Sequence, residues 1–235
     1  MFNKLVLASF CALGATAAGA QSLGTASLGV IGTIRPSTCS VSLGNGGVAD
    51  LGIIGSSTVK SWAIANNPTR YYQNEGKAVP ITITCPSATK FAMSFIDNRA
   101  GNVDSSVNFH HFGLGTYTVA GGEVMNIGPY WIDYQNLKVR STVTGALNSP
   151  GRSFVTTGVA NPSSTFRPTA GTEGVAIYPA DSLAFSANGS ATAPEALVEV
   201  SGNLIFNVQP LKATVDAATT DIVFNGSATL TLVGI

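Results

Sequence analysis

The segment Val79-Pro-Ile-Thr-Ile-Thr-Cys-Pro86 decides the fold class of this chain, because apolar and polar residues alternate along it. Successive side chains of a β-strand point to opposite faces, so one face carries Val79, Ile81, Ile83 and Cys85. A strand with one apolar face is typical of an antiparallel sheet that covers a core with one side only. We therefore predict an all-β chain.

The same period of two recurs along the chain in the segments 26–34, 91–96, 198–208 and 222–232. In the last segment one face carries Ile222, Phe224, Ala228, Leu230 and Leu232. Turn signals separate the strands, among them Asn45-Gly-Gly, Ala120-Gly-Gly and Asn188-Gly-Ser, and no long segment has the helical period of 3.6. Short strands with one buried face, joined by such turns, predict an antiparallel sandwich.

The stretch 142–194 differs from the rest because it is rich in Gly, Ser, Thr, Ala and Pro. We interpret it as a long, loop-rich insertion with one or two short strands, inside a single domain spanning 34–235. A small second lobe is the alternative.

The first twenty residues have the pattern of a secretory signal peptide. Lys4 precedes an apolar stretch from Leu5 to Ala18, and small residues in Ala18-Gly-Ala20 predict cleavage before Gln21. The alternative is a membrane anchor, but the apolar run is shorter than the roughly 20 residues that span a bilayer. We expect export.

Export determines how the cysteines are interpreted. Removal of Cys11 with the signal leaves Cys39 and Cys85, which can pair in an oxidising compartment. A metal site is the rival, with His110-His111 as further ligands. Neighbouring strand residues point to opposite faces, so the two imidazoles would not converge on one ion. We predict a Cys39–Cys85 disulfide and neither metal nor cofactor.

Charge and catalytic motifs give little sign of chemistry. Twelve Lys and Arg balance twelve Asp and Glu, so no basic stripe predicts a nucleic-acid partner. Asp97-Asn-Arg99 follows a strand and is interpreted as a turn with an Asx-type bond and a local ion pair rather than a catalytic acid. Tyr71-Tyr72 and Tyr130-Trp131 could stack on sugars, but core or edge packing is the favoured interpretation. We predict that the chain is not an enzyme.

These features together resemble bacterial chaperone–usher pilins. The resemblance rests on Gly32-Thr-Ile-Arg-Pro-Ser-Thr-Cys39, on Cys85-Pro86 at a strand end, and on Phe224-Asn-Gly-Ser-Ala-Thr-Leu-Thr-Leu232. The chain also looks like an exported, fimbria-associated family of uncharacterised proteins, with the marks Gly46-Gly-Val-Ala-Asp-Leu-Gly52, Asp97-Asn-Arg-Ala-Gly101, Phe112-Gly-Leu-Gly115 and Asn126-Ile-Gly-Pro-Tyr130. The resemblance covers most of the mature chain and is weakest over 142–194.

The resemblance implies an immunoglobulin-like sandwich that lacks its last strand. Its groove would receive a strand from a periplasmic chaperone and then, at an outer-membrane usher, from a neighbouring subunit. The extension 21–33, overlapping the first strand, would be the donated segment, with contacts from Leu23, Ala26, Leu28 and Val30. The receiving side would include the C-terminal strand residues Ile222, Phe224, Leu230 and Leu232. Pilins commonly have a penultimate tyrosine, whereas this chain ends Leu232-Val-Gly-Ile235.

The function that this resemblance implies is that of a structural subunit of a surface fimbria. The alternative is a tip adhesin or host-surface binding protein of the same fold. An adhesin usually has a separate lectin domain ahead of the pilin domain, and 235 residues leave no room for two full domains. Both functions place the protein at the cell surface, reached through the periplasm.

Overall fold

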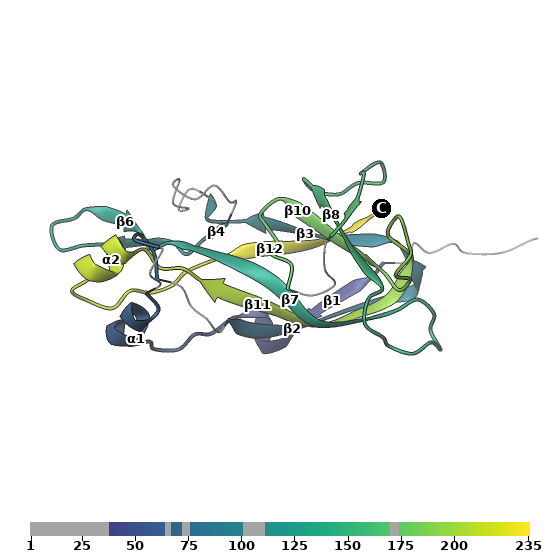
Figure 1. Cartoon of the computed structure of the whole chain (residues 1–235), viewed down its shortest axis with the longest axis horizontal. Coiled ribbons are helices and arrows are strands. Elements are labelled where there is room, and N and C mark those ends of the chain that lie inside the picture. The colour runs from purple at the N-terminus through teal and green to yellow at the C-terminus, as the bar shows by residue number, and fades with distance from the viewer. Residues whose placement is uncertain (1–37, 64–66, 72–75, 101–110, 170–173) are drawn as a thin grey trace, which may run out of the picture. The chain divides into compact units, whose positions relative to one another are not determined.

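The computed structural model describes residues 38–63, 67–71, 76–100, 111–169 and 174–235. Their strands form two five-stranded sheets and one small sheet, and every pairing between strands is antiparallel. The prediction of an all-β antiparallel sandwich is therefore confirmed (Figure 1).

The first sheet has the strand order β1-β2-β11-β7-β4. Its strands are β1 (Ser40–Leu43), β2 (Lys77–Thr89), β11 (Leu197–Val208), β7 (Pro129–Arg140) and β4 (Phe112–Gly113). The second sheet has the order β12-β3-β10-β8-β9. Its strands are β12 (Ala228–Gly234), β3 (Phe91–Asp97), β10 (Asp181–Ser186), β8 (Arg152–Thr157) and β9 (Arg167–Pro168).

Smaller elements complete the described chain. A two-stranded sheet joins β5 (Thr116–Thr118) to β6 (Val124–Asn126), and a 3-10 turn, η1 (Gly44–Gly47), follows β1. Two six-residue helices, α1 (Ser56–Ser61) and α2 (Lys212–Ala217), share a small cluster of Val59, Tyr71 and Val215. No described helix is long and apolar enough to cross a membrane.

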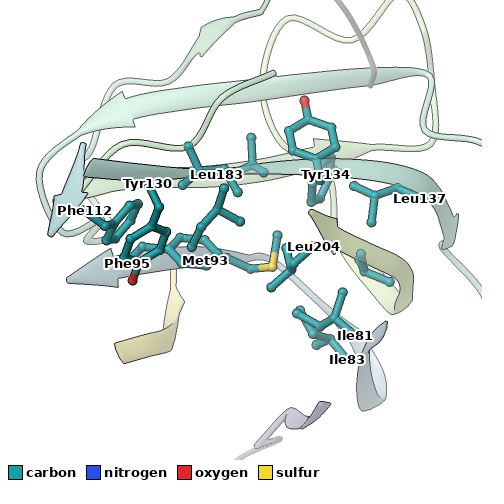
Figure 2. Close-up of a cluster of buried hydrophobic side chains, with 14 of the residues drawn as sticks. Ile81, Ile83, Met93, Phe95, Phe112, Tyr130, Tyr134, Leu137, Leu183 and Leu204 are labelled. Carbon is teal, nitrogen blue, oxygen red and sulfur yellow. The ribbon is translucent and has the colours of Figure 1, made fainter. Parts of the chain in front are cut away.

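The core lies between the inner faces of the two sheets. Tyr134 of β7 meets Phe185 of β10 edge to face, with ring centroids 5.6 Å apart. Ile81 and Ile83 of β2 belong to the same buried cluster as Met93 and Phe95 of β3 (Figure 2). The alternation that predicted β2 and β3 therefore places these side chains correctly.

The disulfide prediction is confirmed, because Cys39 and Cys85 are bonded with their Cα atoms 4.2 Å apart. The bond closes 46 residues of chain and joins the start of β1 to the middle of β2. It therefore fixes the short strand β1 at the edge of the first sheet.

The stretch 142–194 contributes more to the core than its composition indicates. It supplies β8 and β10, which pair over six residues, and β10 also pairs with β3 at the centre of the second sheet. The simple alternation is hidden because β10 is buried on both faces: Leu183 and Phe185 face the main core, whereas Ser182 and Ala184 lie under the segment 158–168. The stretch is loop-rich as predicted, but its described residues form three short strands, β8, β9 and β10, rather than one or two, and β8 and β10 belong to the core.

The C-terminal strand is shorter than the sequence predicts. Strand β12 begins at Ala228, so Ile222 and Phe224 precede it in a segment without regular structure. The segment 218–227 is held by other contacts instead of by a strand ladder. Beyond Leu232, Val233 and Ile235 pack against a small buried cluster on the outer face of the second sheet, formed by Ala92, Ala160 and Ala184. The N–H of Ile235 donates to the carbonyl of Lys90 at 3.2 Å.

Candidate functional site

Strand β1 presents apolar side chains toward the core without burying them. Val41 lies opposite Ile83 and Leu43 opposite Ile81, and directly opposed residues of an antiparallel pair point to the same face. The two isoleucines are 0% and 1% exposed, but Val41 and Leu43 are 41% and 36% exposed. The core is therefore open to solvent at this edge.

Strand β12 forms an edge of the second sheet. Leu230 lies opposite Phe95 and Leu232 opposite Met93, so both leucines point to the core side, where they are half-buried. Thr229 and Thr231, which point the other way, are exposed. Within the described residues β12 pairs with β3 alone, so its other edge is unpaired there.

An apolar groove of about 320 Å³ lies between these two edges. One wall is the chain that follows β1, the other is the chain that leads into β12, and the floor comes from β3, β7 and β11. Its principal apolar lining residues are Leu43, Val48, Leu51, Phe95, Leu114, Tyr130, Ile132, Leu204, Phe206, Val208, Phe224 and Leu230. The groove is therefore lined with apolar side chains like a protein core, but it is open to solvent.

Aromatic rings stack beneath the groove. The Tyr130 ring stacks on Phe112 with centroids 5.1 Å apart and on Phe206 at 6.1 Å (Figure 2 shows the first pair). Gly226 lies directly against Tyr130, because a Cβ there would come within 2.7 Å of the ring. Burial and the nearby Asp97 carboxylate both raise the pKa of the Tyr130 hydroxyl, which therefore remains neutral at physiological pH.

Hydrogen bonds hold the wall that precedes β12. The Tyr117 hydroxyl oxygen accepts the backbone N–H groups of Thr219 at 3.3 Å and Thr220 at 3.2 Å. Farther along, Asn225 N–H donates to the carbonyl of Leu114 at 2.9 Å, and Asn98 N–H donates to that of Ser227 at 3.0 Å. These bonds position Phe224 and Gly226 along the groove although neither lies in a strand.

The predicted receiving residues have different places in this site. Phe224 and Leu230 line the groove, whereas Ile222 and Leu232 pack against the core without lining it. The predicted donor residues Leu23, Ala26, Leu28 and Val30 lie outside the described residues. The sequence reasoning did not assign Val48, Leu51, Leu114 and Tyr130 to the site, although the motifs Gly46–Gly52, Phe112–Gly115 and Asn126–Tyr130 contain them.

The polar candidates have structural partners. Asp97 accepts the N–H of Arg99 at 2.8 Å, which is the predicted Asx-type turn, and the N–H of Gly113 at 2.9 Å. The predicted ion pair with Arg99 is not formed: among the described residues, the ion pairs are Lys60–Asp216 and Arg140–Glu199. Within the same part of the chain, no group of three His, Cys, Asp or Glu side chains could hold a metal ion.

Comparison with known proteins gives one match. Residues 28–130 match the model of a family described as "Protein of unknown function (DUF1120)". This range includes β1, β2, β3 and the motifs around the groove. No curated protein and no solved structure matches the chain.

Proposed function

We propose that this protein is a structural subunit of a surface fimbria whose groove receives a β-strand from a neighbouring copy. The observation that supports this most is the exposure of the core-facing residues Val41 and Leu43 beside an open apolar groove. An edge strand with an exposed apolar face is an aggregation hazard unless another chain covers it. Addition of an extended strand removes the hazard, since its backbone pairs with the edge and its alternate side chains fill the groove.

The occupant that fits is the segment 21–33 of a second copy. Leu23, Ala26, Leu28 and Val30 offer apolar contacts, mostly at alternate positions. Thirteen extended residues reach about 43 Å at about 3.3 Å per residue, which exceeds the roughly 23 Å of a seven-residue strand. The segment is thus long enough to follow the whole of β12.

The remaining parts of the proposal come from the resemblance to chaperone–usher pilins. Before assembly a periplasmic chaperone would occupy it, and an outer-membrane usher would exchange that strand for the extension of the next subunit at the cell surface. The work of the protein would then be assembly, not catalysis.

The decisive experiment adds a peptide of residues 21–33 to the protein lacking residues 1–33. We expect thermal stabilisation that grows with peptide concentration, as binding to the native state alone requires. The receiver variant Leu230→Asp should lose this response, because a charge would enter the apolar groove. Thr231→Asp is the matched control: it lies one residue away on the exposed face and should respond normally.

A peptide with Asp at positions 28 and 30 should be inactive. A monomer that gains nothing from the peptide would mean that the sandwich needs no added strand. Stabilisation of the full mature chain that is independent of its concentration, with no multimers, would mean that the extension fills its own groove. Either result would overturn the proposal.

A further inference from the structure

The face of β7 opposite the groove carries a polar and aromatic cluster that the proposed function does not use. Trp131 and Asp133 alternate with the inward-facing Tyr130 and Ile132, so they lie on the outer face of the first sheet. Asn207 of β11 lies opposite Trp131 and shares this face. The cluster and the groove are therefore on opposite sides of one sheet.

One oxygen of Asp133 organises the cluster. Its Oδ2 accepts the indole N–H of Trp131 and the side-chain N–H of Asn207, each at 3.0 Å. These bonds fix the indole and the amide against the carboxylate. The described residues donate no hydrogen bond to the other oxygen, Oδ1, although the side chain is only partly exposed. Burial raises the pKa of Asp133, while the two hydrogen bonds favour its charged form.

Gly76 helps to build this arrangement. A Cβ at this position would lie 2.4 Å from Oδ1 of Asn207 and 2.4 Å from a methyl carbon of Ile205. The glycine therefore allows the backbone to approach Asn207 closely, and the amide that orients Asp133 is itself confined.

The ring of His111 borders Trp131, and the ring of Tyr178 borders His111 in turn. His111 meets Trp131 edge to face with centroids 6.1 Å apart, and it meets Tyr178 in the same way at 6.1 Å. All three side chains are partly exposed. The surface thus combines apolar ring area with imidazole, phenol and carboxylate groups held in fixed positions.

We propose that this cluster, Trp131, Asp133, His111 and Tyr178, is a binding site for a carbohydrate. A sugar ring has an apolar C–H face that packs on an indole and hydroxyl groups that donate to a carboxylate. Oδ1 of Asp133 is the acceptor, and His111 borders the indole at the rim of the site. A quaternary ammonium ion is the competing ligand, since it too packs on the face of an indole.

The test uses the full chain with the substitution Trp62→Phe. The sequence has two tryptophans, so Trp131 is then the only one left to fluoresce. The probes are methyl mannoside, methyl galactoside, N-acetylglucosamine and, as the cation, choline. Saturation-transfer NMR detects contact with each probe, and tryptophan fluorescence gives the dissociation constant. We expect at least one saccharide to bind saturably with a millimolar constant and to change Trp131 emission.

Asp133→Asn removes the charge while keeping the size of the side chain, and it should weaken this binding about tenfold. Asp216→Asn, which removes a carboxylate near α2, is the matched control and should bind the sugar normally. Binding of no saccharide, equal binding by Asp133→Asn, or binding of choline alone would overturn the proposal. The fimbrial function could fail or succeed independently, since its peptide test concerns the opposite face of the sheet.

Discussion

Strands β1 and β2 carry the same kind of core-facing side chain, yet their environments differ sharply. Ile81 and Ile83 are buried, whereas the opposed Leu43 and Val41 remain more than one-third exposed. All four residues are apolar and point to the same face. The difference therefore arises because β1 has no second paired strand among the described residues, and not from a change in the polarity of the sequence.

The far side of the second sheet shows what a closed edge looks like in the same molecule. There β8 and β10 bury Phe154, Phe185 and even small polar side chains such as Ser182. The Ser182 hydroxyl accepts the N–H of Ala160 at 2.9 Å and lies 2.5 Å from the Ser94 hydroxyl, so both of these buried hydroxyls have partners. Local chain covers this side, whereas the described residues leave the β1–β12 side open.

The largest expected effect comes from opening a cavity in the closed side. Phe154→Ala should lower the free energy of unfolding by about 3–5 kcal/mol, because its ring is fully buried and its neighbours cannot collapse into the space. Urea unfolding followed by circular dichroism measures this loss. Thr157→Ala, at the exposed end of the same strand, should change the value by less than about 0.5 kcal/mol. Equal effects would show that β8 is not part of a packed core.

Removing the disulfide tests how the open side is held. Cys39→Ser together with Cys85→Ser should cost about 2–4 kcal/mol, because the bond restricts a long loop of the unfolded chain. Hydrogen exchange should accelerate most in β1, which has only β2 as a paired neighbour among the described strands. If hydrogen exchange accelerated equally in β1 and β8, the disulfide would not stabilise the open edge more than the rest of the fold.

The sequence predicted β2, whose two faces differ in polarity, and it missed β10, whose two faces are both buried. Strand β2 alternates between buried and exposed residues along most of its length, so its period of two was visible. Strand β10 is buried on both faces and contains serines whose partners lie far away in the sequence, so its composition suggested a loop. Hydrogen bonds across the fold, not local pattern, determine such a strand.

Of the residues around the groove, only those of the edge strand β12 could be predicted from the sequence. Alternation indicated that Leu230 and Leu232 share a face, and the structure has both on the core side. The floor residue Tyr130 and the wall residue Val48 come from segments distant in the sequence, and no periodicity connects them. The position of Phe224 depends on backbone N–H groups on either side of it that donate to the carbonyl of Leu114 and to the hydroxyl of Tyr117, which only the folded chain brings together.

A matched pair of truncations sharpens the comparison between β1 and β2. Ile81→Ala should cost at least about 2 kcal/mol, whereas Leu43→Ala should cost about 1 kcal/mol or less, since Leu43 has lost less contact with water on folding. Denaturant unfolding of both variants gives the difference. In the presence of the 21–33 peptide, the stability losses caused by the two substitutions should become more similar, because a filled groove would bury Leu43. An unchanged difference with bound peptide would place the peptide elsewhere.

The smallest expected effect is a pH dependence from Asp97, a buried carboxyl opposite Ala228 at the start of the open edge. Burial raises its pKa above the ordinary value of 3.8, and the N–H groups of Arg99 and Gly113 oppose that shift without cancelling it. Between 3.8 and the higher folded-state pKa, the folded protein holds a proton that the unfolded chain has released. The contribution of Asp97 to stability is therefore fully present below pH 3.8 and is lost as the pH rises through the folded-state value.

Asp97→Asn removes this titration, so the free energy of unfolding of the wild type minus that of the variant should fall as the pH rises through this window. Urea unfolding at a series of pH values on both sides of 3.8 measures the difference. The difference at the acidic end reports the pH-independent change in hydrogen bonding, because Asn retains one oxygen for the Arg99 N–H but has no second oxygen for that of Gly113. A difference that rises with pH would mean that the hydrogen bonds outweigh burial, and that the charged carboxylate is the form the fold prefers beside the open edge.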